Sequence, residues 1–93
     1  MPEMFFQVRW PDATETMCYS PSLVIRDYFT PGERYRMPEF LERSRVALTI
    51  ASDRVLSKYG YECTSAKAQL AEIERIAHKY GDDTHVTVVS FQQ

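Results

Sequence analysis

The sequence predicts an α+β fold, in which a small and mostly antiparallel sheet carries an antiparallel pair of helices on one face. Three observations indicate it: apolar residues alternate at the start of the chain, recur with a helical period in the middle, and form a β-branched run at the end. A chain of 93 residues has room for one domain with one modest core. We expect a hairpin over 4–19, a short strand over 34–37, helices over 38–59 and 65–80, and a final strand over 85–91.

The first hairpin is predicted by alternation on both sides of a turn. A strongly apolar strand face is formed by every second residue, namely Met4, Phe6, Val8 and Trp10. Pro11-Asp12-Ala13 is typical of a turn, because proline presets φ and aspartate can bond the nearby backbone. The alternation then resumes over 14–19, with Met17 and Tyr19 on one side.

The segment after the hairpin predicts a short helix. Ser20 can cap its start, Pro21 suits the first helical position, and Thr30-Pro31-Gly32 would end it. A strand stays open as the alternative, because Val24 and Ile25 are β-branched.

Two amphipathic helices are predicted by apolar residues at helical spacing. The first spans 38–59 and carries one broad stripe, formed by Phe40, Leu41, Ala47, Leu48, Ala51, Val55 and Tyr59. Gly60 stands where a left-handed residue commonly ends a helix. The second spans 65–80, with Thr64 or Ser65 as its cap and Gly81 as its end. Because the link is short, the helices should lie antiparallel.

The final strand has apolar residues on both faces, among them Val86, Val88 and Val89. Such a strand fits the centre of a sheet, either covered on both sides or facing another subunit. We expect an aromatic-rich surface beyond the helix-covered face, formed by Phe5, Tyr19, Val89 and Phe91. This surface is the basis for expecting a homodimer.

Composition argues against several classes of function. Thirteen acidic and eleven basic residues give a net charge of −2, so no general positive field attracts nucleic acid or anionic lipid. No apolar run approaches the roughly 20 residues of a membrane-spanning helix, and the first residues lack the features of a signal peptide. We therefore expect a cytoplasmic protein with no nucleic-acid partner and no membrane association. Cys18 and Cys63 lie far apart, which favours two reduced thiols over a disulfide.

The sequence contains no recognisable catalytic motif. A cysteine nucleophile needs a histidine base, and only His78 and His85 are available; buried thiols and ordinary histidines explain these residues better. Metal-ligand spacings and a glycine-rich phosphate loop are absent. A DNA-binding helix-turn-helix is disfavoured, because the first helix is long and the second has no excess positive charge. We predict no catalytic residue, no metal site and no cofactor.

Two segments contain candidate ligand-binding residues. One interleaves arginine with tyrosine and could stack a base or clamp a carboxylate or phosphate: Arg26, Tyr28, Arg34, Tyr35 and Arg36. Acidic neighbours nearly balance these charges, so a solvated rim with salt bridges is the alternative interpretation. The other segment is the turn between the two helices, with Tyr59, Tyr61 and Cys63.

Several segments in combination resemble one small bacterial family. They are Val8-Arg9-Trp10-Pro11-Asp12, Cys18-Tyr19-Ser20-Pro21-Ser22, Ser44-Arg45-Val46-Ala47-Leu48, Ala51-Ser52-Asp53-Arg54-Val55 and Lys58-Tyr59-Gly60 with Cys63. Over nearly its whole length, the chain resembles the nitrogen starvation response proteins first named from mycobacteria. Genes of that family commonly lie beside those for a nitrilase, a radical-SAM protein, an acetyltransferase and a flavoprotein. The resemblance implies an accessory role in nitrogen metabolism and supplies no catalytic residues.

Two hypotheses about function follow from these observations. The first is a non-catalytic accessory or assembly protein, homodimeric, that supports enzymes of a nitrilase gene cluster. The second is a small enzyme or ligand-binding protein that acts on a nitrogen-containing metabolite. It would use a cysteine with a histidine, or the arginine and tyrosine rim.

Overall fold

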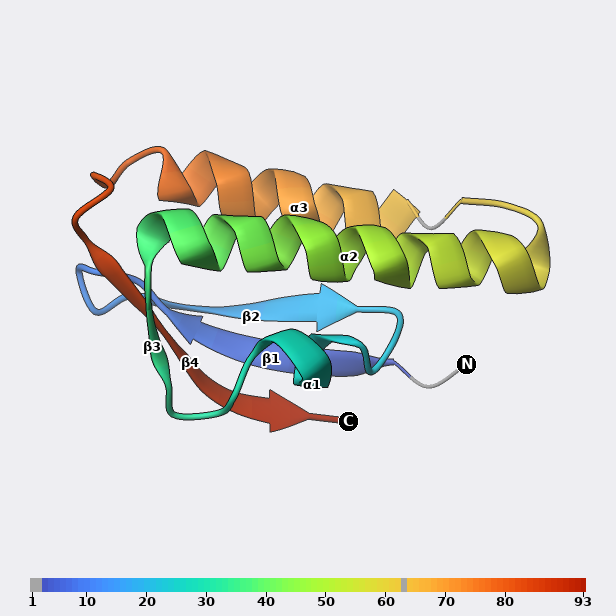
Figure 1. The fold of residues 1–93 in the computed structure, drawn as a ribbon, viewed down its shortest axis with the longest axis horizontal. Coiled ribbons are helices and arrows are strands. Elements are labelled where there is room, and N and C mark those ends of the chain that lie inside the picture. The colour runs from blue at the N-terminus through green and yellow to red at the C-terminus, as the bar shows by residue number, and fades with distance from the viewer. Residues whose placement is uncertain (1–2, 63) are drawn as a thin grey trace.

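The computed structural model describes residues 3–62 and 64–93. It consists of one antiparallel sheet with two long helices on one face (Figure 1). The elements are β1 (Met4–Arg9), β2 (Glu15–Ser20), α1 (Ile25–Tyr28), β3 (Arg34–Arg36), α2 (Met37–Tyr59), α3 (Thr64–Ala77) and β4 (His85–Gln92). The predicted α+β class and the helical hairpin are confirmed.

The sheet has the strand order β2-β1-β4-β3, so the first and last strands of the chain pair at its centre. β1 and β2 form the predicted hairpin, in which Phe5 lies opposite Tyr19 and Arg9 opposite Glu15. β3 ends at Arg36, one residue before the prediction, because Met37 already belongs to α2. β4 is central, as its apolar sequence predicted, and continues to Gln92.

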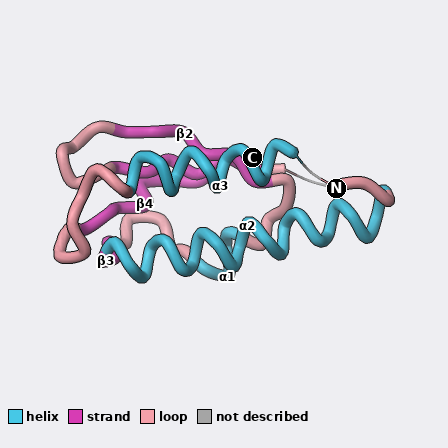
Figure 2. Tube along the Cα trace, turned by 90° about the horizontal axis from the view of Figure 1, so that it is seen from above, coloured by secondary structure: helices cyan, strands magenta, loops and turns pink. Residues whose placement is uncertain are grey.

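The two long helices lie side by side above the sheet, with α3 towards β2 and α2 towards β3 (Figure 2). α2 ends as predicted at Gly60, which has a φ of +78° and donates its N–H to the Leu56 carbonyl at 2.8 Å. α3 ends at Ala77, three residues before the predicted end. The N–H of Tyr80 there bonds the carbonyl three residues back, which tightens the chain into a turn.

The short helix α1 exists, but the predicted serine cap is wrong. Ser20 belongs to β2, and its hydroxyl donates to the Ser22 carbonyl at 2.7 Å. The Ser22 hydroxyl in turn accepts the Val24 N–H at 3.3 Å. These bonds form a turn, so the helix begins only at Ile25.

A β-bulge in β4 corrects the predicted face of Phe91. Gln7 pairs with Ser90 while the next residue, Val8, pairs with Val88, so Val89 is an extra residue. The insertion shifts the alternation by one, because side chains of a strand change face at every residue. Phe91 therefore lies opposite Phe6 and packs against the core, instead of facing away from the helices as predicted.

The core between sheet and helices is rich in aromatic rings. Phe40 of α2 lies 5.6 Å from Trp10 and 5.5 Å from Phe29, measured between ring centroids. The Trp10 indole N–H donates to the Thr16 hydroxyl at 3.0 Å, so its polar atom is satisfied. The core side chains come from one face of the sheet, from the inward stripes of the helices, and from loop residues such as Trp10 and Phe29. The opposite face of the sheet lies outside this core.

The left-handed residues at two turns give the first prediction. Gly60→Ala should lower the free energy of unfolding by about 1 kcal/mol, because alanine is strained at positive φ. An added Cβ would meet no atom within 4 Å, so a steric clash cannot contribute. Ala13 has a φ of +72°. Ala13→Gly should therefore raise the free energy of unfolding, by a smaller amount than Gly60→Ala lowers it. Urea denaturation measures both, and a stabilising Gly60→Ala would contradict the prediction.

Candidate functional site

One face of the sheet is turned away from the two long helices (Figure 1). We call it the outer face. It comprises the odd-numbered residues of β1 and β2, the even-numbered residues of β3, and His85, Thr87, Ser90 and Gln92 of β4. Both long helices lie on the other side of the sheet (Figure 1). The antiparallel register sorts the outer residues into an aromatic end and an arginine end.

The aromatic end consists of Phe5, Met17 and Tyr19. The rings of Phe5 and Tyr19 meet edge to face with centroids 5.6 Å apart, and Met17 beside them is 43% exposed. The Tyr19 hydroxyl donates to Glu3 at 3.1 Å, and the Tyr19 N–H donates to the side chain of Gln69 at 2.9 Å. Through this last bond α3 covers part of the free edge of β2, and Phe5 and Tyr19 line a hollow of about 410 Å³ together with residues of α3.

The arginine end consists of Arg9, Arg34, Arg36, Thr87 and His85. Thr87 lies between Arg9 and Arg34 in one row across three strands, and His85 lies opposite Arg36 in the next row. The Arg9 guanidinium is paired with the Glu15 carboxylate at 2.7 Å. Within residues 3–62 and 64–93, Arg34 and Arg36 take part in no ion pair.

The predicted arginine–tyrosine rim is split by the sheet. Tyr35 is buried on the inner face, and its hydroxyl accepts the Thr30 N–H at 2.9 Å. Arg34 and Arg36 flank it in sequence and therefore lie on the outer face. The cation above the Tyr35 ring is instead Arg43 of α2, at 5.3 Å from the centroid. A clamp that combines Tyr35 with its neighbouring arginines is therefore not formed.

The remaining rim residues lie apart from this end. Arg26 is exposed on α1. Tyr28 lines a shallow hollow of about 360 Å³ with Glu39, Glu42, Arg43 and Val46. Arg36 reaches a neighbouring hollow that shares both of these glutamates. The acidic first turns of α2 thus supply part of the charge balance that the sequence predicted, including an ion pair of 3.8 Å between Glu39 and Arg43.

The two tyrosines at the junction of α2 and α3 lie close to each other and to Tyr19 of the sheet. Tyr59 and Tyr61 have ring centroids 6.0 Å apart. They line a hollow of about 270 Å³ that also includes Tyr19 and Glu3. The third residue predicted there, Cys63, lies outside the described residues. These tyrosines and the arginines of β3 lie near opposite ends of α2, so they do not form one site.

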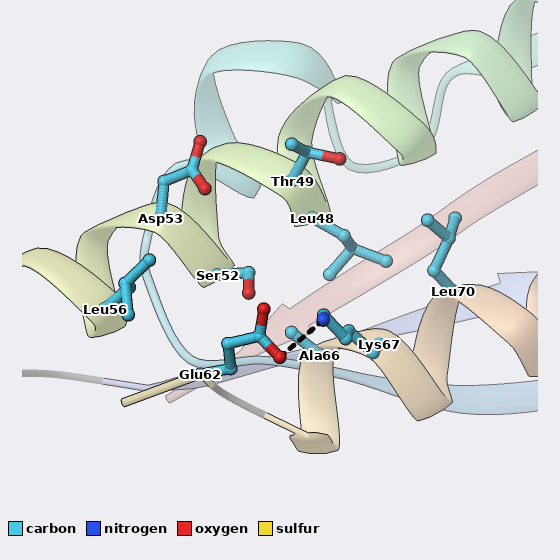
Figure 3. A pocket seen from close by; sticks show the side chains of 9 residues that line it. All are labelled: Leu48, Thr49, Ser52, Asp53, Leu56, Glu62, Ala66, Lys67 and Leu70. Carbon is cyan, nitrogen blue, oxygen red and sulfur yellow. Dashed lines mark hydrogen bonds and ion pairs between the residues drawn. The ribbon is translucent and has the colours of Figure 1, made fainter. Parts of the chain in front are cut away.

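A further groove between α2 and α3 contains none of the predicted candidates (Figure 3). It has a volume of about 140 Å³, and an ion pair of 2.6 Å between Lys67 and Glu62 lies at one side. On α2 it is lined by residues at helical spacing: Thr49, Ser52, Asp53 and Leu56. The polar residues at this spacing were the only feature of the sequence that pointed to the groove. They did not predict it, because any solvent-exposed helix face gives the same pattern.

Cys18 is poorly suited to act as a nucleophile. Its side chain is buried on the inner face, and burial, with a smaller effect of the Glu72 charge, raises the pKa of the thiol to about 12. His85 is on the outer face, so the sheet separates it from Cys18. In the described part of the chain, no three histidine, cysteine, aspartate or glutamate residues are placed to hold a metal ion. No described helix has the length and apolar character that a membrane span needs.

The fold defines a class of protein, namely a small α+β domain in which two long helices cover one face of the sheet (Figure 1). The particular group comes from the comparison with protein families. The model of the nitrogen starvation-induced protein NitG matches residues 5–91, and the chain belongs to this family. The resemblance seen in the sequence is thereby confirmed. Comparisons with curated proteins and with solved structures found no match.

The burial of Cys18 predicts a stability change at alkaline pH. The folded-state pKa of about 12 lies above the ordinary value of 9.0, so the unfolded state loses this proton first. The contribution of the thiol to stability is complete below pH 9 and declines as pH rises further. In a Cys63→Ser background, urea denaturation should show a loss of roughly 1–2 kcal/mol between pH 8 and 10.5 from this thiol.

The matched control is the same background with Cys18→Ala. It should lose less stability over this pH range, because only the shared lysine and tyrosine titrations remain. Equal pH dependence of the two proteins would show that Cys18 is not protected, and would reopen its use as a nucleophile.

Proposed function

We propose that this NitG-family protein is a non-catalytic accessory or assembly protein of the nitrogen starvation response, which acts in the cytoplasm by docking partner proteins on its outer face. The observation that carries the proposal is the outer face itself. Met17 is exposed there, and the rings of Phe5 and Tyr19 beside it are partly exposed, so the three side chains form one apolar patch. Contiguous apolar patches of this kind are typical of contact surfaces.

The proposed partners are enzymes of a nitrilase-type gene cluster. Membership of the family supports the link to nitrogen starvation. Genes of the nitrogen starvation response proteins that this chain resembles commonly lie beside a nitrilase gene, and this neighbourhood indicates which enzymes to test. The competing hypothesis of a cysteine enzyme is weakened for Cys18 by its burial and raised pKa. That hypothesis would have to rest on Cys63.

We also propose that the free protein forms a homodimer through the aromatic end. Three side chains make a small contact, and interfaces well below about 1,200 Å² in total are weak or transient. The expected dimer therefore dissociates in the micromolar range and leaves the arginine end accessible.

Met17→Lys tests the dimer. Light scattering after size-exclusion chromatography should give the wild type an average mass that rises from 10.9 kDa towards twice this value with concentration. Met17→Lys should remain at the monomer mass, because a charge in the contact would have to be desolvated.

Val46→Lys is the matched control, because Val46 on α2 is exposed to a similar extent, 40% against 43%. It should behave like the wild type. A wild type that stays monomeric at high micromolar concentration would remove the dimer from the proposal.

Ser90→Trp tests the docking role, because Ser90 lies in the middle row of the outer face. Tagged wild type purified from nitrogen-starved cells should retain an enzyme encoded in its gene cluster. Ser90→Trp should retain about tenfold less of this enzyme, which corresponds to a loss of roughly 1.4 kcal/mol in binding free energy. Quantitative mass spectrometry of the retained proteins measures this ratio.

Ser57→Trp makes the same chemical change on the exposed side of α2 and should retain the enzyme. Equal loss in both variants would place docking elsewhere. Absence of every cluster enzyme from the wild type would contradict the accessory role with these partners.

A further inference from the structure

The arginine end of the outer face carries an inference about partner chemistry. We propose that it binds an extended acidic segment of a partner protein, with carboxylates on alternate residues. This inference rests on the accessory role proposed above and specifies what the docked protein presents. It follows from the spacing of the arginines, from the charge of the rest of the chain, and from the lack of ion pairs at Arg34 and Arg36 within residues 3–62 and 64–93.

The spacing of the arginines matches an extended peptide. Arg34 and Arg36 are two residues apart on β3, which places their side chains on one face at roughly 6.6–6.8 Å spacing. Alternate side chains of a second extended chain have the same spacing. Two carboxylates of such a chain can therefore meet both guanidinium groups at once, each in the bidentate geometry that arginine favours.

Arg9 and His85 extend this site across the sheet. Arg9 is separated from Arg34 by Thr87, and His85 lies directly opposite Arg36. Side chains opposite one another on neighbouring strands are roughly 4.5–5.5 Å apart. The site thus offers guanidinium and imidazole groups in two adjacent rows, with the Thr87 hydroxyl between them.

The charges on the arginine end are incompletely balanced. Only Arg9 has an ion pair, with Glu15, while Arg34 and Arg36 have none within the described residues. Glu39 and Glu42 border Arg36 across a hollow without pairing with it. The strands place three arginines and one glutamate on the outer face, although the chain as a whole carries −2. Complementary carboxylates on a partner would satisfy the two unpaired guanidinium groups.

A protein segment fits this site better than nucleic acid or a second copy. Nucleic acid binding typically uses roughly six to ten phosphate contacts, whereas this end supplies three arginines, one of which is already paired. In a face-to-face homodimer covering this end, six arginines would be buried with only two copies of Glu15, which is costly because buried charges need partners. An acidic segment brings the missing carboxylates.

The experiment is a titration of isotope-labelled protein followed by amide chemical shifts. The probe is a synthetic decapeptide that alternates glutamate with serine, (Glu-Ser)₅, at 50 mM NaCl. We expect saturable shifts confined to the arginine end, with Thr87, Arg34 and Arg36 among the most affected. Binding should weaken at least threefold at 300 mM NaCl, because it is electrostatic. (Gln-Ser)₅ should produce no shifts.

Arg34→Gln/Arg36→Gln should weaken (Glu-Ser)₅ binding at least tenfold. Arg26→Gln/Arg75→Gln removes the same charge from exposed positions on α1 and α3 and should change the affinity less than twofold. Equal weakening by the two double variants would overturn the site in favour of general charge attraction. Shifts centred elsewhere, or tighter binding of a ten-nucleotide single-stranded DNA than of the peptide, would also overturn it.

The outcomes also separate this inference from the accessory role. If the peptide leaves the spectrum unchanged while wild type still retains its cluster enzyme and Ser90→Trp does not, only the acidic-segment inference is wrong. If the peptide binds as expected but no cluster enzyme is retained, the site stands and the proposed partners are wrong.

Discussion

The pairing of β1 with β4 is the contact on which the rest of this structure depends. It joins the first and last strands at the centre of the sheet, and it contains the bulge at Val89. Without that extra residue, Phe91 would point away from the helices; with it, Phe91 and Phe6 both face the core. The bulge thus makes a strand with apolar residues in both registers into a one-sided strand, so that one face of the sheet is buried and the other is largely polar.

The edges of the sheet and its outer face differ in how far other parts of the domain cover them. β3 has only three residues, and Gln69 of α3 bonds the Tyr19 N–H of β2, so both edge strands are short or partly covered. The outer face has no such protection within the described residues. Its apolar side chains gather at one end and its guanidinium groups at the other, which is the composition of a contact surface with an apolar part and a charged part.

The chain belongs to the nitrogen starvation-induced NitG proteins, and its strands place three arginines at one end of the outer face. Cys18, the one described cysteine, contributes to packing, with a pKa that keeps it protonated at neutral pH. The proposed function through protein contact rests on the distribution of apolar and guanidinium groups over the outer face.

The sequence by itself determined the element order, the α+β class, the glycine end of α2 and the family. These features depend on local periods, on the φ of one residue and on segments read in combination. Alternation also placed Met4, Phe6 and Val8 on the buried face and Phe5 and Tyr19 on the opposite face. Tertiary structure alone decided the face of Phe91 and the separation of Tyr35 from its neighbouring arginines. Phe91 was assigned to the wrong face because a bulge leaves no local signal, and Tyr35 was grouped with arginines from which the sheet separates it. Alternation shows that two faces exist, but only pairing with neighbouring strands shows which groups meet on each of them.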